Sequence, residues 1–198
     1  MSFIFTLILS LHLTTVPFLS HFQPIKILTN TKQYAKGYVY HDENENLSMD
    51  NNEIGIPDVY VSNGVEIVKT DKDGRYKIPV SDDAIIFVIK PRNWMTPIND
   101  LNLPQFYYIH KPNGSPSNFT FKGVDATGPL PKNINFPLYA ENGKSNFKMI
   151  VFGDPQPYSL EEVDFFSENI VSELIGVKGV EFGMTMGDIV GDNLDLLD

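Results

Sequence analysis

The chain has 198 residues, 42% of them hydrophobic, which is enough to bury one or two ordinary cores. Its 15 Lys and Arg face 25 Asp and Glu, and the resulting net charge of −10 disfavours bulk binding to the phosphate backbone of nucleic acids. The absence of cysteine excludes disulfides, thiolate zinc sites and a cysteine nucleophile.

Residues 1–22 are strongly apolar, and no Asp, Glu, Lys or Arg occurs before Lys26. This pattern predicts a signal peptide, and therefore an exported protein that is periplasmic or extracellular. A buried strand or a spurious start are the alternatives. Pro17 disfavours a membrane-spanning helix, and no cysteine follows that would carry a lipid anchor.

Between residues 35 and 92, short apolar alternations are separated by turn residues. The runs are residues 37–40, 55–61, 66–70, 75–80 and 84–90. Five or six strands at this spacing are typical of a small antiparallel β-sandwich. Asn63-Gly64 and Asp73-Gly74 lie between runs, and we expect both to form hairpin turns.

Residues 93–143 are rich in proline and aromatic side chains and show almost no helical period. This composition predicts an ordered, extended connector rather than a flexible linker. Its aromatic side chains are expected to pack against a neighbouring domain.

Residues 144–198 have a different pattern. A compact apolar run at 147–153 predicts a strand, Ser159-Leu-Glu-Glu162 is a capping box that predicts a helix to about Ile175, and residues 180–186 predict a second strand. Strand, helix and strand at this spacing predict a right-handed βαβ unit with parallel strands. The expected fold class is therefore α+β with two domains, a small antiparallel β-sandwich followed by the first βαβ unit of an α/β domain.

Two aspartates follow the predicted parallel strands, Asp154 after the first and Asp188 after the second. Ligands gather outside the carboxyl ends of such strands, and neighbouring strands lie about 5 Å apart. Both carboxylates are therefore expected within reach of one metal cluster. A lone aspartate at such a position is more often a helix N-cap, but two in register, each beside a glycine, favour a metal site.

The segments Asp154-Pro-Gln156 and Gly187-Asp-Ile-Val-Gly-Asp192 resemble the first two blocks of the calcineurin-like metallophosphoesterases, D-x-H and G-D-x-x-x-D. Residues 106–116 and 135–138 are similar to the amino-terminal region of an exported bacterial branch of that family. The expected fold of residues 144–198 is then the start of the phosphoesterase catalytic domain.

This resemblance implies a role for each matching residue. Asp154 would bind the first metal, Gln156 would stand where the family has histidine, Asp188 would bridge both metals and Asp192 would support the site. The implied cofactors are two divalent ions, manganese, iron, zinc or magnesium, and the amide in place of an imidazole favours a hard ion. In the complete enzyme the metals would activate a water for attack on a phosphoester.

The family's later blocks, G-N-H and two histidine-bearing segments, do not occur in this sequence. All four histidines precede Asp154: His12, His21, His41 and His110. We therefore expect the remaining metal ligands to lie outside this chain and the piece alone to be inactive. The substrate, a small-molecule or macromolecular phosphoester, is left open.

A second constellation lies within the predicted sandwich, at residues 42–53. Oxygen donors recur at the spacing of the calcium loop D-x-[DN]-x-[DN]-G-x5-E, namely Asp42, Asn44, Asn46, the backbone of Ser48, Asp50 and Glu53. Leu47 replaces the glycine, where a sharp turn strains the backbone. The loop resembles those of serine-aspartate repeat B-type domains, and a solvated acidic hairpin loop is the alternative.

Two functions remain in competition. The first is a phosphoesterase whose catalytic machinery continues beyond residue 198, and the second is a secreted, calcium-stabilised β-sandwich that serves binding or adhesion without catalysis. A G-N-H block in the sequence that follows would decide for the enzyme.

Overall fold

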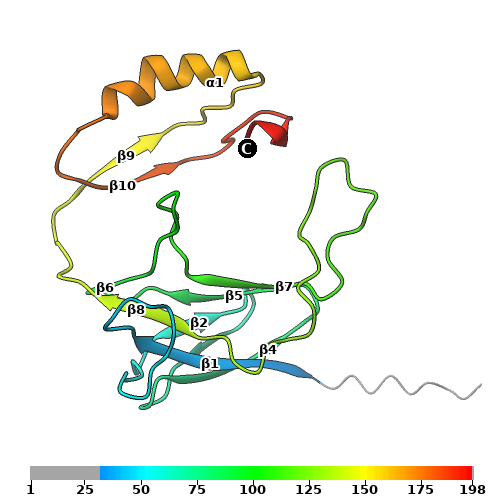
Figure 1. Cartoon of the computed structure of the whole chain (residues 1–198), viewed down its shortest axis with the longest axis vertical. Coiled ribbons are helices and arrows are strands. Elements are labelled where there is room, and N and C mark those ends of the chain that lie inside the picture. Colours follow the sequence, from blue (N-terminus) through cyan, green and yellow to red (C-terminus); the bar gives the residue numbers. More distant parts are fainter. Residues whose placement is uncertain (1–31, 198) are drawn as a thin grey trace, which may run out of the picture. The chain divides into compact units, whose positions relative to one another are not determined.

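The computed structural model describes residues 32–197 (Figure 1). The expected signal peptide at residues 1–22 lies outside the described residues. Within residues 32–197, no helix combines the length and the apolar character needed to cross a membrane.

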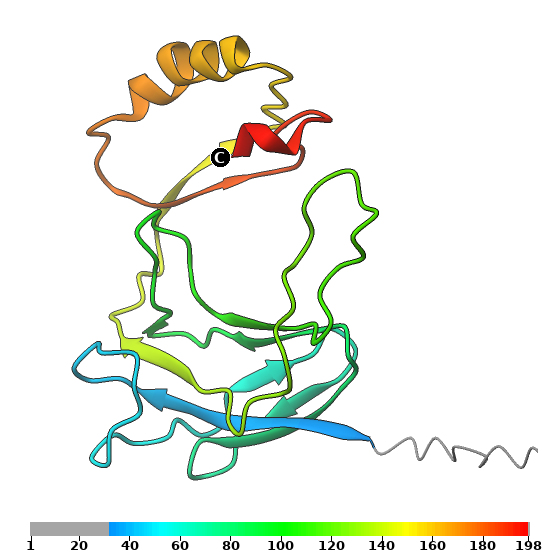
Figure 2. The ribbon, with the colours of Figure 1, turned by 45° about the vertical axis from the view of Figure 1, so that its right-hand side comes forward.

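Two four-stranded sheets form a β-sandwich (Figures 1 and 2). The first sheet has the order β4-β1-β8-β6 and is made of Gln33–His41 (β1), Arg75–Val80 (β4), Trp94–Met95 (β6) and Phe136–Ala140 (β8). The second has the order β3-β2-β5-β7 and is made of Tyr60–Ser62 (β2), Ile67–Lys69 (β3), Ala84–Ile89 (β5) and Tyr107–His110 (β7).

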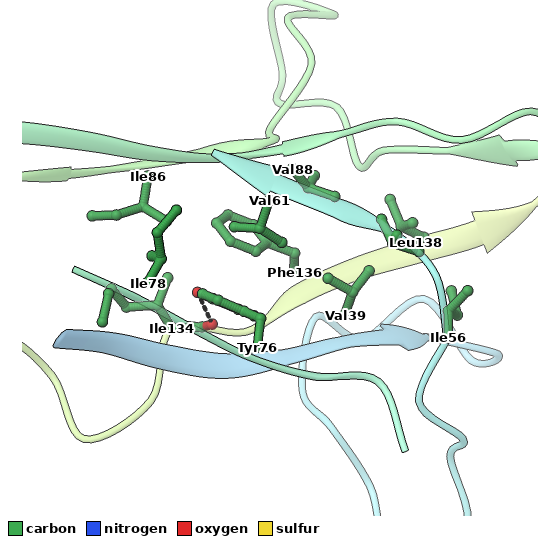
Figure 3. Close-up of a cluster of buried hydrophobic side chains, with 12 residues drawn as sticks. Val39, Ile56, Val61, Tyr76, Ile78, Ile86, Val88, Ile134, Phe136 and Leu138 are labelled. Atoms are coloured by element: carbon green, nitrogen blue, oxygen red, sulfur yellow. Dashed lines mark hydrogen bonds between the residues drawn. The ribbon is translucent and has the colours of Figure 1, made fainter. Parts of the chain in front are cut away.

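The hydrophobic core lies between these sheets, and strand alternation builds it. In β1 and β4, every second side chain points inward, and the register pairs Ala35 with Ile78 and Gly37 with Tyr76. The opposite sheet contributes the buried Val61, Ile86 and Val88 (Figure 3). Alternation between core and solvent is clearest in residues 34–39 of β1 and 75–78 of β4.

The sandwich extends beyond residue 92, where we expected a connector. β7 pairs antiparallel with β5, and β8 pairs parallel with β1, so both are strands of the sandwich. Phe136 and Leu138 of β8 are buried in the core. The prediction was wrong here because both strands are short, β8 contains Pro137, and neither strand pairs with the strand next to it in sequence.

The α+β class with a β-sandwich is confirmed, but the first sheet is mixed rather than purely antiparallel. The prediction of antiparallel strands rested on local hairpins. A strand that returns from the far end of the module, as β8 does, is free to run parallel to its neighbour.

One of the two predicted hairpin turns is confirmed and the other is wrong. Asn63-Gly64 joins the antiparallel strands β2 and β3, and Gly64 has the positive φ of 85° that the turn requires. Asp73-Gly74 instead links β3 to β4, which lie in different sheets, so it is not a hairpin. Gly74 is needed for another reason, since a Cβ there would lie 2.5 Å from the Cα of Gly55.

The carboxyl-terminal part contains the predicted strand, helix and strand. Lys148–Phe152 (β9) and Val180–Thr185 (β10) pair in parallel, as expected. Between them a helical segment comprises Leu160–Phe166 (α1), a π-helical stretch Ser167–Val171 and a 3-10 turn Ser172–Leu174. Ser159 caps α1 by accepting the backbone N–H of Glu162, and a further 3-10 turn spans Leu194–Leu197.

α1 covers one face of the β9–β10 pair (Figures 1 and 2), and the rings of Phe152 and Phe166 meet edge to face at 5.4 Å. The other face carries exposed apolar side chains: Phe147, Met149, Val151, Phe182 and Met184. Parallel sheets are ordinarily covered on both faces. The described residues therefore supply one of the two layers that this sheet needs.

Candidate metal centre

The loops that follow β9 and β10 are joined by backbone hydrogen bonds. The donors and acceptors are Met186 N to Phe152 O at 2.9 Å, Gln156 N to Asp188 O at 2.9 Å, and Gly191 N to Pro157 O at 2.8 Å. Parallel pairing thus continues past the strands into the loops that carry the predicted metal ligands. Gly191 is required there because a Cβ would lie 2.5 Å from the Tyr158 ring.

Two of the predicted ligands are in direct contact. The side-chain nitrogen of Gln156 donates a hydrogen bond to Asp188 Oδ2 at 2.7 Å. This contact fixes one carboxylate oxygen of Asp188, while Oδ1 remains available to a cation. Both residues belong to loops outside the carboxyl ends of parallel strands, where the sequence placed them.

The backbone of the first loop is unusual. Asp154 has a φ of 65° and Gln156 a φ of 41°, so two residues with side chains occupy the left-handed region within three positions. Such conformations cost of order 1 to 3 kcal/mol each and persist where the surrounding structure holds them. They cluster at active sites and ligand-binding sites, and the metal-binding role of Asp154 and Gln156 stays a prediction.

The oxygen atoms of the predicted ligands are the type of donor that a hard divalent ion prefers, but there are too few of them to hold one. Asp154 and Asp188 are exposed carboxylates, and Gln156 adds an amide oxygen. Across residues 32–197, no three His, Cys, Asp or Glu side chains gather into a group that would hold an ion. Asp192 follows Gly191 at the far end of the second loop and is exposed.

The predicted calcium loop at residues 42–53 is tightly folded around Asp42. This residue is 1% exposed, its Oδ1 accepts the backbone N–H of Asn46 at 3.1 Å, and its Oδ2 accepts that of Leu47 at 2.8 Å. Leu47 has a φ of 64°, so the chain makes the left-handed turn at the position where the calcium pattern has glycine.

The remaining predicted calcium ligands bind one another. Asp50 Oδ2 accepts the side-chain N–H groups of Asn44 and Asn46 at 2.9 and 3.0 Å. The two carboxylate oxygens of Glu53 accept the backbone N–H groups of Glu43 and Asp50 at 3.1 and 2.9 Å. Ser48 N donates to Asn46 Oδ1 at 2.8 Å. The side chains of this loop are therefore bound to one another and to its backbone, and Asp42, Asp50 and Glu53 do not gather into a group that would hold an ion.

Tyr40 lies beneath this loop, and its place there was not predicted from the sequence. It is fully buried outside the hydrophobic core cluster, and its hydroxyl has no hydrogen-bond partner within the described part of the chain. Burial raises the pKa of Tyr40, and the nearby carboxylates of Asp42 and Glu53 raise it further. The alternation along β1, which turns Tyr40 away from the core, was the signal that could have found it.

Comparison with known proteins gives one family. Residues 43–125 match the family model described as the N terminal of Calcineurin-like phosphoesterase. This range begins in the loop after β1 and ends beyond β7, so it lies mostly in the sandwich. No curated protein matches the chain. This part of the chain is therefore similar to the amino-terminal domain of calcineurin-like phosphoesterases.

Proposed function

We propose that this chain is the amino-terminal part of an exported, metal-dependent phosphoesterase of the calcineurin-like type. The observation that carries the proposal is the junction of the two loops, where Gln156 donates to Asp188 and the backbones are paired. The family match over residues 43–125 supports the same assignment from a different part of the chain.

Asp154, Gln156 and Asp188 would hold the metal at this edge of the sheet, with Asp192 in support. Two divalent ions bound there (manganese, iron, zinc or magnesium) would lower the pKa of a bridging water and neutralise the phosphoryl oxygens. Gln156 orients the Asp188 carboxylate through its amide N–H, which leaves the other carboxylate oxygen for the cation. An all-oxygen donor set favours manganese or magnesium over zinc.

In this proposal the remaining ligands come from sequence beyond Asp198, so the 198-residue piece alone hydrolyses no phosphoester. The apolar face of β9 and β10 opposite α1 would be covered by the same continuing domain. The substrate is a small-molecule or macromolecular phosphoester, without bulk nucleic-acid binding. Export rests on the apolar residues 1–22.

The test compares variants of the full-length protein with manganese, by turnover of chromogenic phosphoesters and by bound metal. Asp188→Asn should lower activity more than Gln156→Ala, whose expected loss is about 10- to 100-fold because its amide orients the carboxylate. Asp195→Asn removes an equal charge from an exposed position and should leave activity unchanged. Full activity and full metal content in Asp188→Asn would contradict the proposal.

The loop at residues 42–53 favours a second function, in which calcium stabilises the sandwich as a binding or adhesion module. Its support is the spacing of oxygen-bearing residues in the sequence together with the left-handed backbone of Leu47, held by the Asp42 carboxylate at the position where the calcium pattern has glycine. In this proposal calcium takes over the carboxylate oxygens of Asp50 and Glu53 that now accept N–H groups. A ligand that binds only the folded form raises the melting temperature.

Calorimetric melting with calcium and after chelation checks this second function. Calcium should raise the melting temperature of the chain, and Glu53→Gln should remove most of that increase. Glu43→Gln is the matched control, because Glu43 occupies a position of the pattern that supplies no side-chain ligand. An unchanged calcium response in Glu53→Gln would exclude this role for the loop.

A further inference from the structure

The outer face of β1 and β4 gathers positive charge on an acidic protein. Strand alternation places Lys36, Arg75 and Lys77 on this solvent-facing side. The whole chain has a net charge of −10. Arg75 is paired with Asp73, whereas Lys36 and Lys77 form no ion pair within residues 32–197 and leave a local excess of positive charge on this face. Such a face would attract an anionic partner that the rest of the surface repels.

The register sets two of these cations directly against each other. Lys36 of β1 is the cross-strand partner of Lys77 of β4. Like charges in directly opposed positions destabilise a sheet, because their Cβ atoms lie about 5 Å apart. Within residues 32–197, neither lysine forms an ion pair, so no carboxylate of the described chain relieves the repulsion. A bound anion would relieve it.

Two tyrosines hold the cations in place. Lys77 Nζ lies 4.4 Å from the ring centroid of Tyr34, and the Arg75 guanidinium lies 5.5 Å from that of Tyr38. Arg75 Nε also donates to the Tyr38 hydroxyl at 3.1 Å, which leaves the hydroxyl proton free to donate to a ligand. The positive groups are thus ordered before any ligand arrives.

A groove follows these side chains along the sheet. It has a volume of about 400 Å³, it lies open at the surface, and its lining includes Lys36, Tyr38, Arg75, Lys77 and Asn133. Asp71 also lines the groove, but its carboxylate accepts the backbone N–H groups of Asp73 and Arg75. An open groove of this kind accommodates a passing polymer rather than an enclosed small molecule.

We propose that this groove binds an acidic polysaccharide, whose anionic groups lie between Lys36 and Lys77 while sugar hydroxyls contact Tyr38 and Asn133. The carboxylate, sulfate or phosphate groups of such a polymer share the chemistry that the paired ammonium groups recognise. This surface is separate from the loops after β9 and β10, and its role does not depend on phosphoesterase activity.

Nucleic acid fits this surface less well. Single-stranded nucleic acids bind through bases stacked on exposed aromatic faces, but Lys77 already lies over the ring of Tyr34 and Arg75 over that of Tyr38. An acidic polysaccharide instead offers hydroxyl groups beside its anionic groups, which suit the hydrogen-bonding side chains of Tyr38 and Asn133 in the lining.

The test measures binding of the whole chain to dextran sulfate, polygalacturonate, uncharged dextran and an oligothymidylate at low ionic strength. At least one of the two acidic polysaccharides should bind, the stronger one identifies the preferred anionic group, and affinity should fall as salt rises. Lys36→Ala/Lys77→Ala should weaken binding about tenfold or more, since it removes two charge-assisted contacts.

Two further variants separate binding from folding and from bulk charge. Lys77→Glu should abolish binding without lowering the melting temperature, because it replaces the opposed like charges by an opposed pair of unlike charges. Lys122→Ala/Lys178→Ala removes two exposed lysines elsewhere and should keep full affinity. The proposal is overturned by equal binding of uncharged dextran, by tighter binding of the oligothymidylate, or by unchanged affinity in Lys36→Ala/Lys77→Ala.

Discussion

Leu47 holds a left-handed backbone with a φ of 64° although its side chain is 60% exposed. This conformation costs a residue with a Cβ about 1 to 2 kcal/mol of free energy, and an exposed side chain offsets little of that cost through packing. The conformation persists because Asp42 Oδ2 accepts the Leu47 N–H. The loop is therefore held by a buried carboxylate against a local preference.

Leu47→Gly should raise the free energy of unfolding by about 1 kcal/mol, because glycine adopts positive φ without steric cost. Urea denaturation in the presence of a calcium chelator measures the change without a contribution from a bound ion. Leu47→Ala is the control, since alanine keeps the Cβ and should gain nothing. An equal gain in both variants would place the effect in the exposed leucine side chain rather than in its backbone.

At the candidate site, the sequence predicted that Asp154 and Asp188 follow neighbouring parallel strands at one sheet edge, and the pairing of β9 with β10 agrees with this placement. It did not predict that the side chain bound to Asp188 is that of Gln156, because such a contact depends on loop conformation rather than on the strand pattern. The alternation along β1 places Tyr40 on the face opposite the core, but its burial there depends on the packing of the acidic loop, which no local pattern indicates.

Among the secondary-structure elements, β4 and the segment before β8 are tied by a single buried hydrogen bond. The Tyr76 hydroxyl donates to the Ile134 carbonyl at 2.7 Å inside the core (Figure 3). Burial raises the pKa of Tyr76, so the hydroxyl keeps its proton and remains a donor. The bond fixes a segment that has no regular strand structure of its own.

Tyr76→Phe should lower the free energy of unfolding by about 1 to 2 kcal/mol, because it leaves the buried Ile134 carbonyl without its donor while the packing of the ring is kept. Thermal or chemical denaturation measures the loss. Tyr34→Phe is the control, as Tyr34 is 39% exposed, and it should change stability by less than about 0.5 kcal/mol. Equal losses in both variants would show that the Tyr76 bond is not the cause.

Strands with a clear local alternation were predicted from the sequence, whereas strands that pair with residues far away in sequence were not. β4 occupies the predicted residues 75–80 and β5 lies within the predicted 84–90, because their alternation is local. β7 and β8 were hidden in the supposed connector. Tyr38 N donates a hydrogen bond to Asn135 Oδ1, 97 residues away in sequence. A local sequence pattern cannot indicate a partner at such a distance.

For the whole molecule, the late strands determine where the sandwich ends. β8 lies between β1 and β6, while β6 and β7 each form the edge of a sheet, so a module cut at residue 92 would lose one central strand and two edge strands. Phe136 and Leu138 alone bury apolar side chains worth roughly 3 to 6 kcal/mol, which is comparable to the total stability of a small domain.

A chain of residues 32–142 should therefore fold cooperatively, whereas residues 32–92 should not. Circular dichroism with thermal melting distinguishes the two, since only the longer piece should show a single sharp transition. A cooperative transition in the shorter piece would show that β7 and β8 are accessory to the sandwich and would restore the boundary at residue 92.

The parallel pairing of β1 with β8 also determines the order in which the strands can pair during synthesis. As the ribosome releases the chain from its amino end, β4 can reach β1 early, but the opposite edge of β1 stays open until residue 140 has left the exit tunnel. An open strand edge beside exposed apolar side chains invites pairing with other chains. The nascent protein is thus most prone to aggregation during the elongation of its proline-rich middle, and holdase chaperones would act on it in that interval.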